Sequence, residues 1–481
     1  MQQIRFALAS LDPGSVAHQA QDEPAEATIY PVRGHDSALT FDRPLVVGNR
    51  GMGKSFWAAV LSHQEGRKRA SELYPRARLD GLQVALGFHE AAGKRSGDLA
   101  PSQREVAELL RQKKTAETIW HGVLLRALAG TGPVPQFDNL QASIAVIEHE
   151  PLKYEQWLRE ADNALQGGNK RFLLLFDALD RLSNDWHIIR NLTRELLRLS
   201  LDLTGYRAIR AKIFMRSDQY SDGSLFDFQD ASKIKIGAVK LEWKRADLYG
   251  FLFTQILNNA AAACEFEAII LKAAKLKVFS DDLRQRLRED EILQADIFSQ
   301  IAGQFMGTDR RRGRTYTWLH QHLADAFEQT SPRSFVLAVN RAATSGQAPA
   351  KTAIDYNGIK EGVVAASRLR VDELKEDNIW IGQALDDLVD LEVPCDPKSF
   401  IQRWKARETV RRVEAMLKDS ERPGPLAFED KGLSREKALL QSLIALGVVE
   451  ERAQDRVNMP DLFRVAARIK RRGGVKPPAR S

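Results

Sequence analysis

"PLVVGNRGMGKSFW", residues 44–57, is the stretch that decides the fold of this chain. Its apolar run ends in three glycines within six residues, and a lysine and a serine follow directly. Fixing a glycine costs backbone entropy, so such a cluster indicates a bend where the main chain is needed and side chains would interfere. The flanking segments predict a strand, LVV, before the bend and a helix, SFWAAVL, after it.

Four residues of this bend fit the pattern G-x-x-x-x-G-K-[ST] of a P-loop. Backbone N–H groups in such a bend form a nest for phosphate oxygens, and the start of the following helix adds its positive dipole end. Lys54 would reach the β- and γ-phosphates of ATP, and the Ser55 hydroxyl would ligate Mg²⁺. The predicted nucleotide-binding residues are Gly48, Asn49, Arg50, Gly51, Met52, Gly53, Lys54, Ser55 and Phe56.

The composition of the whole chain is that of an ordinary globular protein. It has 481 residues, 43% of them hydrophobic and 28% charged, and a net charge of +7. This length indicates about three domains, and the charge is compatible with nucleic acid without demonstrating binding. Cys264 and Cys395 form no CxxC, and no secretory leader or membrane-spanning run is present, so we expect a cytoplasmic protein without a membrane partner.

A second motif lies in "RFLLLFDALDRL", residues 171–182. Asp177 ends a continuous apolar run of strand length, on a strand that we expect beside the P-loop strand. A carboxylate there can orient water on Mg²⁺, and Asp180 is placed to activate the attacking water. Alternatively, Asp177 caps a helix and Asp180 is a solvated charge.

Together, the P-loop and "LLLFDALDRL" resemble the STAND and NACHT branch of the AAA-like ATPases. The resemblance implies an ATPase with an α/β P-loop parallel sheet and a helical lid. Arg181 stands where the family motif ends in Glu, and the long spacing between the two motifs suggests an insertion around 90–150.

Two further segments resemble sensor motifs of these ATPases. "KIFMRSD" resembles the strand whose end carries a γ-phosphate sensor, which makes Arg216 the candidate. "TSPRSFVLAVNRA", residues 330–342, resembles the helical lid, with Arg333 at the position of the second sensor. A buried arginine must find an anion, and for both residues a structural carboxylate is the alternative to a nucleotide.

Other patterns complete the expected fold. Apolar runs within 82–88, 211–220 and 233–243 predict strands, and a helix after 182 presents Ile189, Leu192, Leu196 and Leu199 on one face. The expected domains are an irregular lead-in (1–40), a P-loop core (41–244), a helical lid (245–345), a helical middle region (346–425) and a terminal module (426–481).

The terminal module follows the order of a winged helix-turn-helix. "SREKALLQSLIALG" predicts a helix capped by Ser434, "VVEE" and "RVNM" predict two strands, and Pro460 opens a last helix, "DLFRVAARIK". The ending also resembles a group of bacterial P-loop ATPases with a terminal winged helix, some of them linked to mobile elements and phage defence.

Two basic clusters are candidates for nucleic-acid binding, with a solvated tail and a charged loop as the alternatives. The tail offers Arg464, Arg468, Lys470, Arg471, Arg472 and Lys476 without an acidic residue, and "DRRRGRTYTW", residues 309–318, adds aromatics that could stack on bases. The helix at 434–446 carries few cations, which favours a protein contact or a non-specific grip for the winged helix.

The leading hypothesis is an ATP-dependent molecular switch that moves its lid and winged helix and engages DNA or a separate effector protein. A homo-oligomer is also expected, in which a neighbour supplies an arginine. The candidates are Arg190, Arg194, Arg198, Arg207 and Arg210. The alternatives are a nucleic-acid loader whose grip is controlled by ATP, and a scaffold that binds nucleotide without hydrolysing it.

Overall fold

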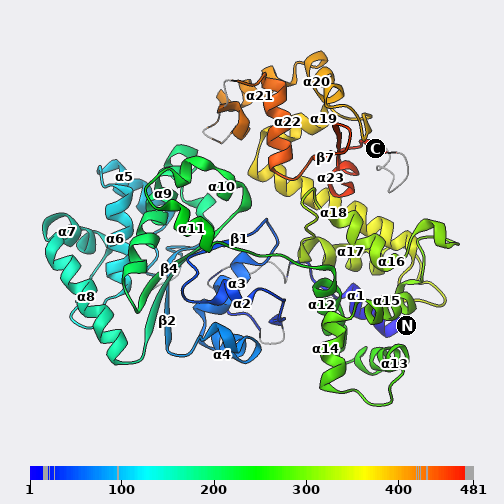
Figure 1. Ribbon diagram of the computed structural model, residues 1–481, viewed down its shortest axis with the longest axis horizontal. Helices are drawn as coiled ribbons and strands as arrows, with labels where there is room; N and C mark the ends of the chain where they lie inside the picture. The colour runs from blue at the N-terminus through cyan, green and yellow to red at the C-terminus, as the bar shows by residue number, and fades with distance from the viewer. Residues whose placement is uncertain are drawn as a thin grey trace. The chain divides into compact units, whose positions relative to one another are not determined.

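The computed structural model describes residues 1–14, 20, 22–25, 28–94, 97–418, 420, 422, 424–429 and 432–471. The chain divides into two compact units (Figure 1). One unit is Ala17–Glu242, and the other combines Met1–Val16 with Trp243–Ser481. The predicted arginine and lysine at 472 and 476 fall outside the described residues.

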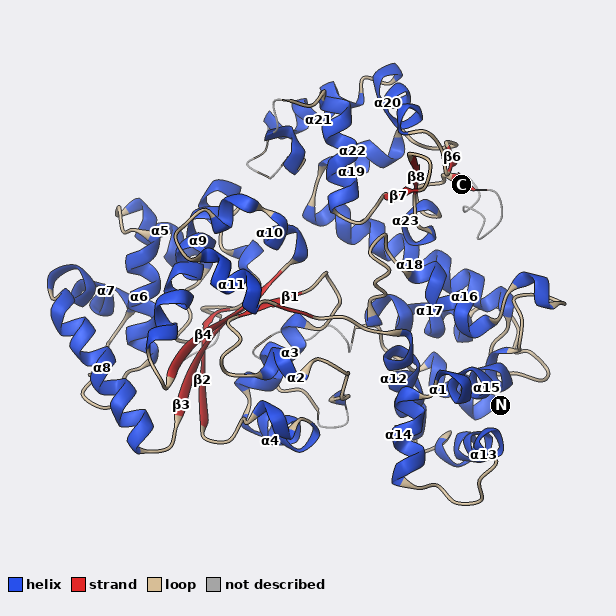
Figure 2. Ribbon diagram, viewed as in Figure 1, coloured by secondary structure: helices blue, strands red, loops and turns tan. Residues whose placement is uncertain are grey.

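The first unit is built on a five-stranded parallel sheet, drawn in red in Figure 2. Its strands have the order β2-β3-β4-β1-β5. Continuous apolar runs form the central strands because both faces of the sheet are covered, so that Leu173, Leu174 and Leu175 are all buried. The predicted α/β fold class with a P-loop parallel sheet is confirmed. The strands are β1 (Leu45–Val47), β2 (Leu82–Phe88), β3 (Arg171–Phe176), β4 (Ile209–Met215) and β5 (Val239–Lys240).

One predicted strand is largely wrong. Residues 233–243 were expected to be extended, but their first part belongs to helix α11 (Ala231–Gly237), and only β5 is a strand. The alternation of polar and apolar residues in "KIKI" is typical of a strand. In the structure, however, Ala231 and Ile234 are buried, three positions apart as on one face of a helix, while Ile236 is exposed.

Helices cover this sheet and fill the long segment between β2 and β3. The side chains of Ser102, Thr115 and Asn139 cap three of them by accepting backbone N–H groups. The predicted stripe after 182 is confirmed on α9, where its leucines and isoleucine are buried. The helices are α2 (Asp36–Leu39), α3 (Lys54–Ser62), α4 (Gln64–Leu73), α5 (Gln103–Arg111), α6 (Ala116–Ala127), α7 (Leu140–His149), α8 (Pro151–Gly167), α9 (Trp186–Asp202) and α10 (Ser217–Ser221).

The second unit is mainly helical and begins with a helix that the sequence analysis missed. Helix α1 (Gln2–Ala9) lies within the expected irregular lead-in and buries Ile4, Ala7 and Leu8. The Nδ2 group of Asn340 donates to the carbonyls of Ala9 and Leu11, both at 2.8 Å, so residues distant in sequence hold the end of this helix. The others are α12 (Arg245–Asn258), α13 (Ala263–Ala274), α14 (Asp281–Glu289), α15 (Glu291–Ala302), α16 (Thr315–Leu323), α17 (Pro332–Thr344) and α18 (Tyr356–Asp377).

The end of the chain contains the predicted helix, α22 (Arg435–Ala445), and the predicted antiparallel pair, β7 (Glu450–Arg452) and β8 (Arg456–Asn458). The last helix is shorter than expected. Helix α23 (Asp461–Arg464) has four residues, and the chain then extends into β9 (Lys470–Arg471), which pairs with β6 (Glu392–Val393). The remaining helices are α19 (Trp380–Asp386), α20 (Pro397–Ala406) and α21 (Thr409–Lys418).

Residues before position 426 contribute a strand to this terminal module. Cys395 and Val457 exchange two backbone hydrogen bonds of 3.0 and 2.9 Å, which adds the segment around β6 to the β7–β8 pair. Phe400 and Trp404 of α20 are buried in the same apolar core as Leu443 of α22. The terminal module therefore includes residues from 392–404, which local sequence patterns could not indicate.

Candidate nucleotide-binding site

The P-loop joins the end of β1 to the start of α3. The Gly48 N–H donates to the Met215 carbonyl (3.1 Å), which continues the pairing of β1 with β4. Gly51 and Gly53 have φ values of +81° and +99°, in the left-handed region that other residues avoid. Gly53 forms the N-cap of α3, and no side chain among the described residues caps this helix start. The positive end of the α3 dipole therefore lies at this bend, where a bound anion is favoured.

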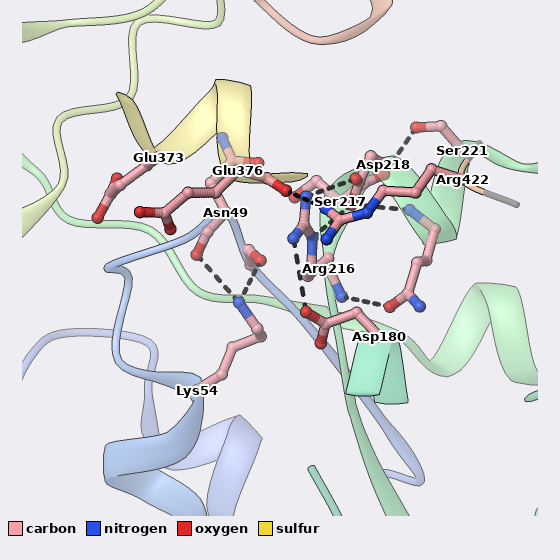
Figure 3. A network of polar contacts seen from close by, with 12 residues as sticks. Asn49, Lys54, Asp180, Arg216, Ser217, Asp218, Ser221, Glu373, Glu376 and Arg422 are labelled. Carbon is pink, nitrogen blue, oxygen red and sulfur yellow. Dashed lines mark hydrogen bonds and ion pairs between the residues drawn. The ribbon is translucent and has the colours of Figure 1, made fainter. Parts of the chain in front are cut away.

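Lys54 lies inside this bend (Figure 3). Its Nζ group donates to the carbonyls of Gly48 (2.8 Å) and Asn49 (3.1 Å). Burial lowers the pKa of Lys54 to about 8, although the charge of Asp177 acts in the opposite direction. The ammonium of this half-buried residue is thus held against main-chain carbonyls, in an environment that favours an added negative charge.

The side chains of Met52 and Phe56 contact the protein itself. Met52 is buried, and Phe56 packs edge-on against Trp57 with ring centroids 5.2 Å apart. Trp57 in turn donates from Nε1 to Nδ1 of His35 (2.9 Å). If Met52 and Phe56 contact a nucleotide, as the motif predicts, we expect their backbone amides to do so.

Asp177 follows the last residue of β3 and accepts a hydrogen bond from the Ser55 hydroxyl. Its backbone N–H donates to the Phe88 carbonyl (3.0 Å), and burial raises the pKa of its carboxyl group. Asp177 was expected on the strand beside β1, but β4 lies between β1 and β3. The two side chains still meet because parallel strands end at the same edge of the sheet.

The contact between Ser55 and Asp177 joins the two oxygen donors predicted for Mg²⁺. No group of three or more His, Cys, Asp or Glu residues that could hold a metal by itself occurs in the part of the chain that the structure describes. The donor set nevertheless fits Mg²⁺, because this ion is usually bound by one or two protein oxygens together with phosphate oxygens and water.

Arg216 lies at the end of β4, between the strand ends that carry the P-loop and Asp177. Its Nε and Nη2 groups donate to the two carboxylate oxygens of Asp218, at 3.0 and 2.7 Å (Figure 3). Burial alone would raise the pKa of Asp218, but the charge and hydrogen bonds of Arg216 lower it below its ordinary value. Arg216 thus has a structural carboxylate partner, and Asp218 is a site residue that the sequence analysis missed. The signal was present as an acidic residue two positions after the arginine.

Asp180 and Arg181 lie in a 3₁₀ helix, Leu179–Arg181, directly after Asp177. Ala178 turns the chain there with a φ of +57°. The Asp180 carboxylate lies 3.8 Å from Nη1 of Arg216, so it faces the strand ends of the site. Arg181, which replaces the Glu of the related motif, pairs instead with Glu90 at 3.0 Å.

Arg333 belongs to the second unit. It lies in the first turn of α17, which Ser331 caps, and its Nη1 group donates to Glu373 of α18 (2.8 Å). Arg370 donates to the other oxygen of Glu373 (3.2 Å), so two guanidinium groups share one carboxylate. A sensor role for Arg333 stays a prediction.

The arginine-finger candidates differ in their environments. Arg190 is paired with Asp222 (2.6 Å), and Arg210 donates to three main-chain carbonyls. Arg194 is half-buried, whereas Arg198 and Arg207 are exposed on the surface of the first unit. Arg198 is paired with Glu195 at 3.3 Å, so the exposed Arg207 is the candidate most available to a neighbouring subunit.

The basic tail is less available than the sequence indicated. Arg464 is fully buried and donates to Asp461 (2.7 Å) and to the Ile469 carbonyl (3.0 Å), so it presents no charge to a nucleic acid in this structure. Lys470 and Arg471 are exposed but lie 3.3 Å from Asp390 and Asp461, respectively. Arg468 is half-buried. Most of the described tail cations are thus neutralised within the protein.

No protein-family model and no curated protein matches the chain. Among solved structures, the chain is similar to the ORC2 protein of Aeropyrum pernix in its ADPNP-ADP complexes, with 16% identity over 90% of this chain and 87% of that one and a TM-score of 0.29. It is also similar to Cdc6p of Pyrobaculum aerophilum, with 13% identity, 88% and 84% coverage and a TM-score of 0.27. At these TM-scores and identities, the similarity gives no indication of function.

No helix among the described residues is long and apolar enough to cross a membrane.

Proposed function

We propose that this protein binds Mg-ATP at the P-loop, hydrolyses it, and uses the change of nucleotide state as a molecular switch. The observation that carries the proposal is the meeting of Ser55 and Asp177 beside the ammonium of Lys54. A hydroxyl, a carboxylate and an ammonium at the end of a glycine bend are the groups that phosphoryl transfer requires for positioning and charge stabilisation.

Each residue has a defined part in this proposal. The amides at the start of α3 hold the phosphate oxygens, and Lys54 exchanges its two carbonyl partners for the β- and γ-phosphates. Ser55 and Asp177 would hold Mg²⁺, which supplies neutralisation of the phosphate charge. Asp180 orients the attacking water.

Arg216 and Arg333 would report the presence of the γ-phosphate. Arg216 can leave Asp218 for the phosphate, because the two anions compete for the same guanidinium group. Arg333 would couple the nucleotide to the helical lid, and loss of the γ-phosphate would release both contacts. The lid (245–345) and the terminal winged helix (426–481, together with the strand from 392–395) are the proposed moving parts.

Nucleotide binding and phosphate release test this proposal. We expect Lys54→Ala and Asp177→Asn to lose Mg-ATP binding measured by calorimetry. Lys68→Ala is the matched control, because Lys68 is an exposed lysine of α4 in the same unit, and it should bind like the wild type. Unchanged affinity in Lys54→Ala would refute the site.

Asp180→Asn separates hydrolysis from binding. A hydrolase should lose most phosphate release in this variant while it keeps nucleotide affinity. Equal background rates in the wild type and the variant would favour the scaffold alternative, which Arg181 in place of Glu motivates.

A homo-oligomer that completes the site in trans is a second part of the proposal, supported by the exposure of Arg207. Size-exclusion chromatography with and without ATP tests it, and a monomer under both conditions would contradict it. A separate effector protein, a role in phage defence and a cytoplasmic location stay predictions.

A further inference from the structure

The loop between α15 and α16, residues 304–314, is a closed and strongly basic structure that the nucleotide site does not use. We call it the arginine loop. Phe305 and Arg314 form an antiparallel bridge, and the Met306 N–H donates to the Gly313 carbonyl (2.9 Å). Thr315 closes the base, where its hydroxyl donates to the Gly303 carbonyl (2.6 Å). Main-chain hydrogen bonds thus hold the two ends of the loop together, and the residues between them form its tip.

The tip carries a high density of unneutralised positive charge. Arg310, Arg311 and Arg312 form one 3₁₀ turn, and all three are exposed, as is Arg314. The single acidic residue of the loop, Asp309, uses its carboxylate to accept the Arg311 backbone N–H (2.7 Å). No ion pair of these four guanidinium groups is found within the part of the chain that the structure describes. Adjacent like charges repel one another, so a bound polyanion would lower the energy of this turn.

This environment contrasts with that of the basic tail. Arg464 and Arg471 share the Asp461 carboxylate, and Lys470 lies beside Asp390. Intramolecular carboxylates already offset these charges, so a phosphate would have to displace them. The arginine loop has no such competitor among the described residues, which makes it the stronger electrostatic site of this unit.

The neighbouring aromatics do not form a stacking platform. Tyr316 is buried, and its hydroxyl donates to Gln294 (2.6 Å). Trp318 stacks on His322 with ring centroids 3.7 Å apart. The predicted stacking of bases on these residues is therefore not supported. Met306 is buried too, so the tip lacks the exposed apolar side chains with which a loop inserts into a membrane.

We propose that the arginine loop binds the sugar–phosphate backbone of a nucleic-acid duplex. Guanidinium groups recognise phosphate oxygens by paired N–H donors, and consecutive arginines on a closed loop can reach successive phosphates. This contact reads charge and shape, without base edges, so it gives affinity with little sequence specificity. The inference does not depend on nucleotide binding at the P-loop.

The test uses the full chain and a fluorescein-labelled duplex DNA of random sequence, with fluorescence anisotropy measured over a series of salt concentrations. The test variant changes Arg310→Gln, Arg311→Gln and Arg312→Gln together. We expect its affinity near 0.1 M salt to fall at least about tenfold, and the slope of log affinity against log salt to flatten by about 2 to 3, since each phosphate contact contributes about 0.9.

A matched control removes the same charge elsewhere in the same unit, through Arg284→Gln, Lys405→Gln and Arg411→Gln, all at exposed positions. It should retain wild-type affinity and slope. An equal loss in both variants, wild-type behaviour of the loop variant, or a salt-independent wild type would each overturn the proposal. Single-stranded DNA and vesicles containing phosphatidylserine are two further probes. Tighter binding of the single strand than of the duplex would overturn the proposal. Binding to the vesicles in place of DNA that depends on the arginine loop would overturn it too.

Discussion

Replacing Lys54 with methionine tests whether the Lys54 ammonium destabilises the nucleotide-free protein and stabilises the nucleotide-bound protein. Burial lowers the pKa of Lys54 from 10.5 to about 8. Since the folded-state pKa lies below the unfolded-state value, the charged amine disfavours folding. This cost is fully present below pH 8 and disappears as the pH rises toward 10.5. The difference corresponds to about 3 kcal/mol at pH 7.

Methionine has a similar length and no charge. We therefore expect the free energy of unfolding of the nucleotide-free protein at pH 7 to rise by up to about 3 kcal/mol. The gain is reduced by the free energy of the two hydrogen bonds that Lys54 donates to the carbonyls of Gly48 and Asn49, because methionine cannot make them. The melting temperature should rise by roughly 2 to 4 °C for each kcal/mol gained. Saturating Mg-ATP should stabilise the wild type by about 3 kcal/mol at one hundred times the dissociation constant, and should leave the variant unchanged.

Thermal unfolding with and without Mg-ATP measures both effects. Lys212→Met is the matched control, because Lys212 is a fully buried lysine of β4 whose pKa burial lowers to about 7, and it donates to the carbonyls of Thr40 and Arg43. It should gain stability in the same way and keep its response to Mg-ATP. A Lys54→Met protein that is less stable than the wild type without nucleotide, or that responds fully to Mg-ATP, would refute the reasoning.

Three further predictions concern the same site. Asp218→Asn removes the carboxylate that competes for Arg216, so ATP affinity relative to ADP should rise roughly tenfold in calorimetry, which is the scale of one charge-assisted hydrogen bond; an unchanged ratio would mean that Arg216 does not contact the γ-phosphate. Gly51→Ala should cost about 1–2 kcal/mol of stability, because its φ is +81°, and should also weaken nucleotide binding. Gly97→Ala, with the same φ of +81° and open space around it, should cost similar stability and leave binding intact. Finally, nucleotide affinity should fall about 20-fold between pH 7.5 and 9.5 as Lys54 loses its proton, whereas Lys54→Arg, which stays charged, should show little dependence on pH over this range.

Local signals were sufficient for the elements that carry the chemistry. The glycine bend, the apolar run before Asp177 and the run before Arg216 are each complete within about ten residues, and strand ends of a parallel sheet meet at one edge. These elements and their common location were therefore predictable. The order of the strands was not, because β4 enters between β1 and β3 from a later part of the chain.

The sequence by itself determined which residues can bind phosphate, because a nest of backbone amides needs only consecutive residues with the right conformational freedom. Only the tertiary structure decided which charges remain available. Arg464 and Arg312 both lie in basic clusters of the sequence. Arg464 is buried and donates a hydrogen bond to Asp461, whereas Arg312 is exposed at the tip of a closed loop. Arg216 likewise found its carboxylate in Asp218. The physical reason is that charge neutralisation depends on distance and burial in three dimensions, and a linear pattern contains neither quantity.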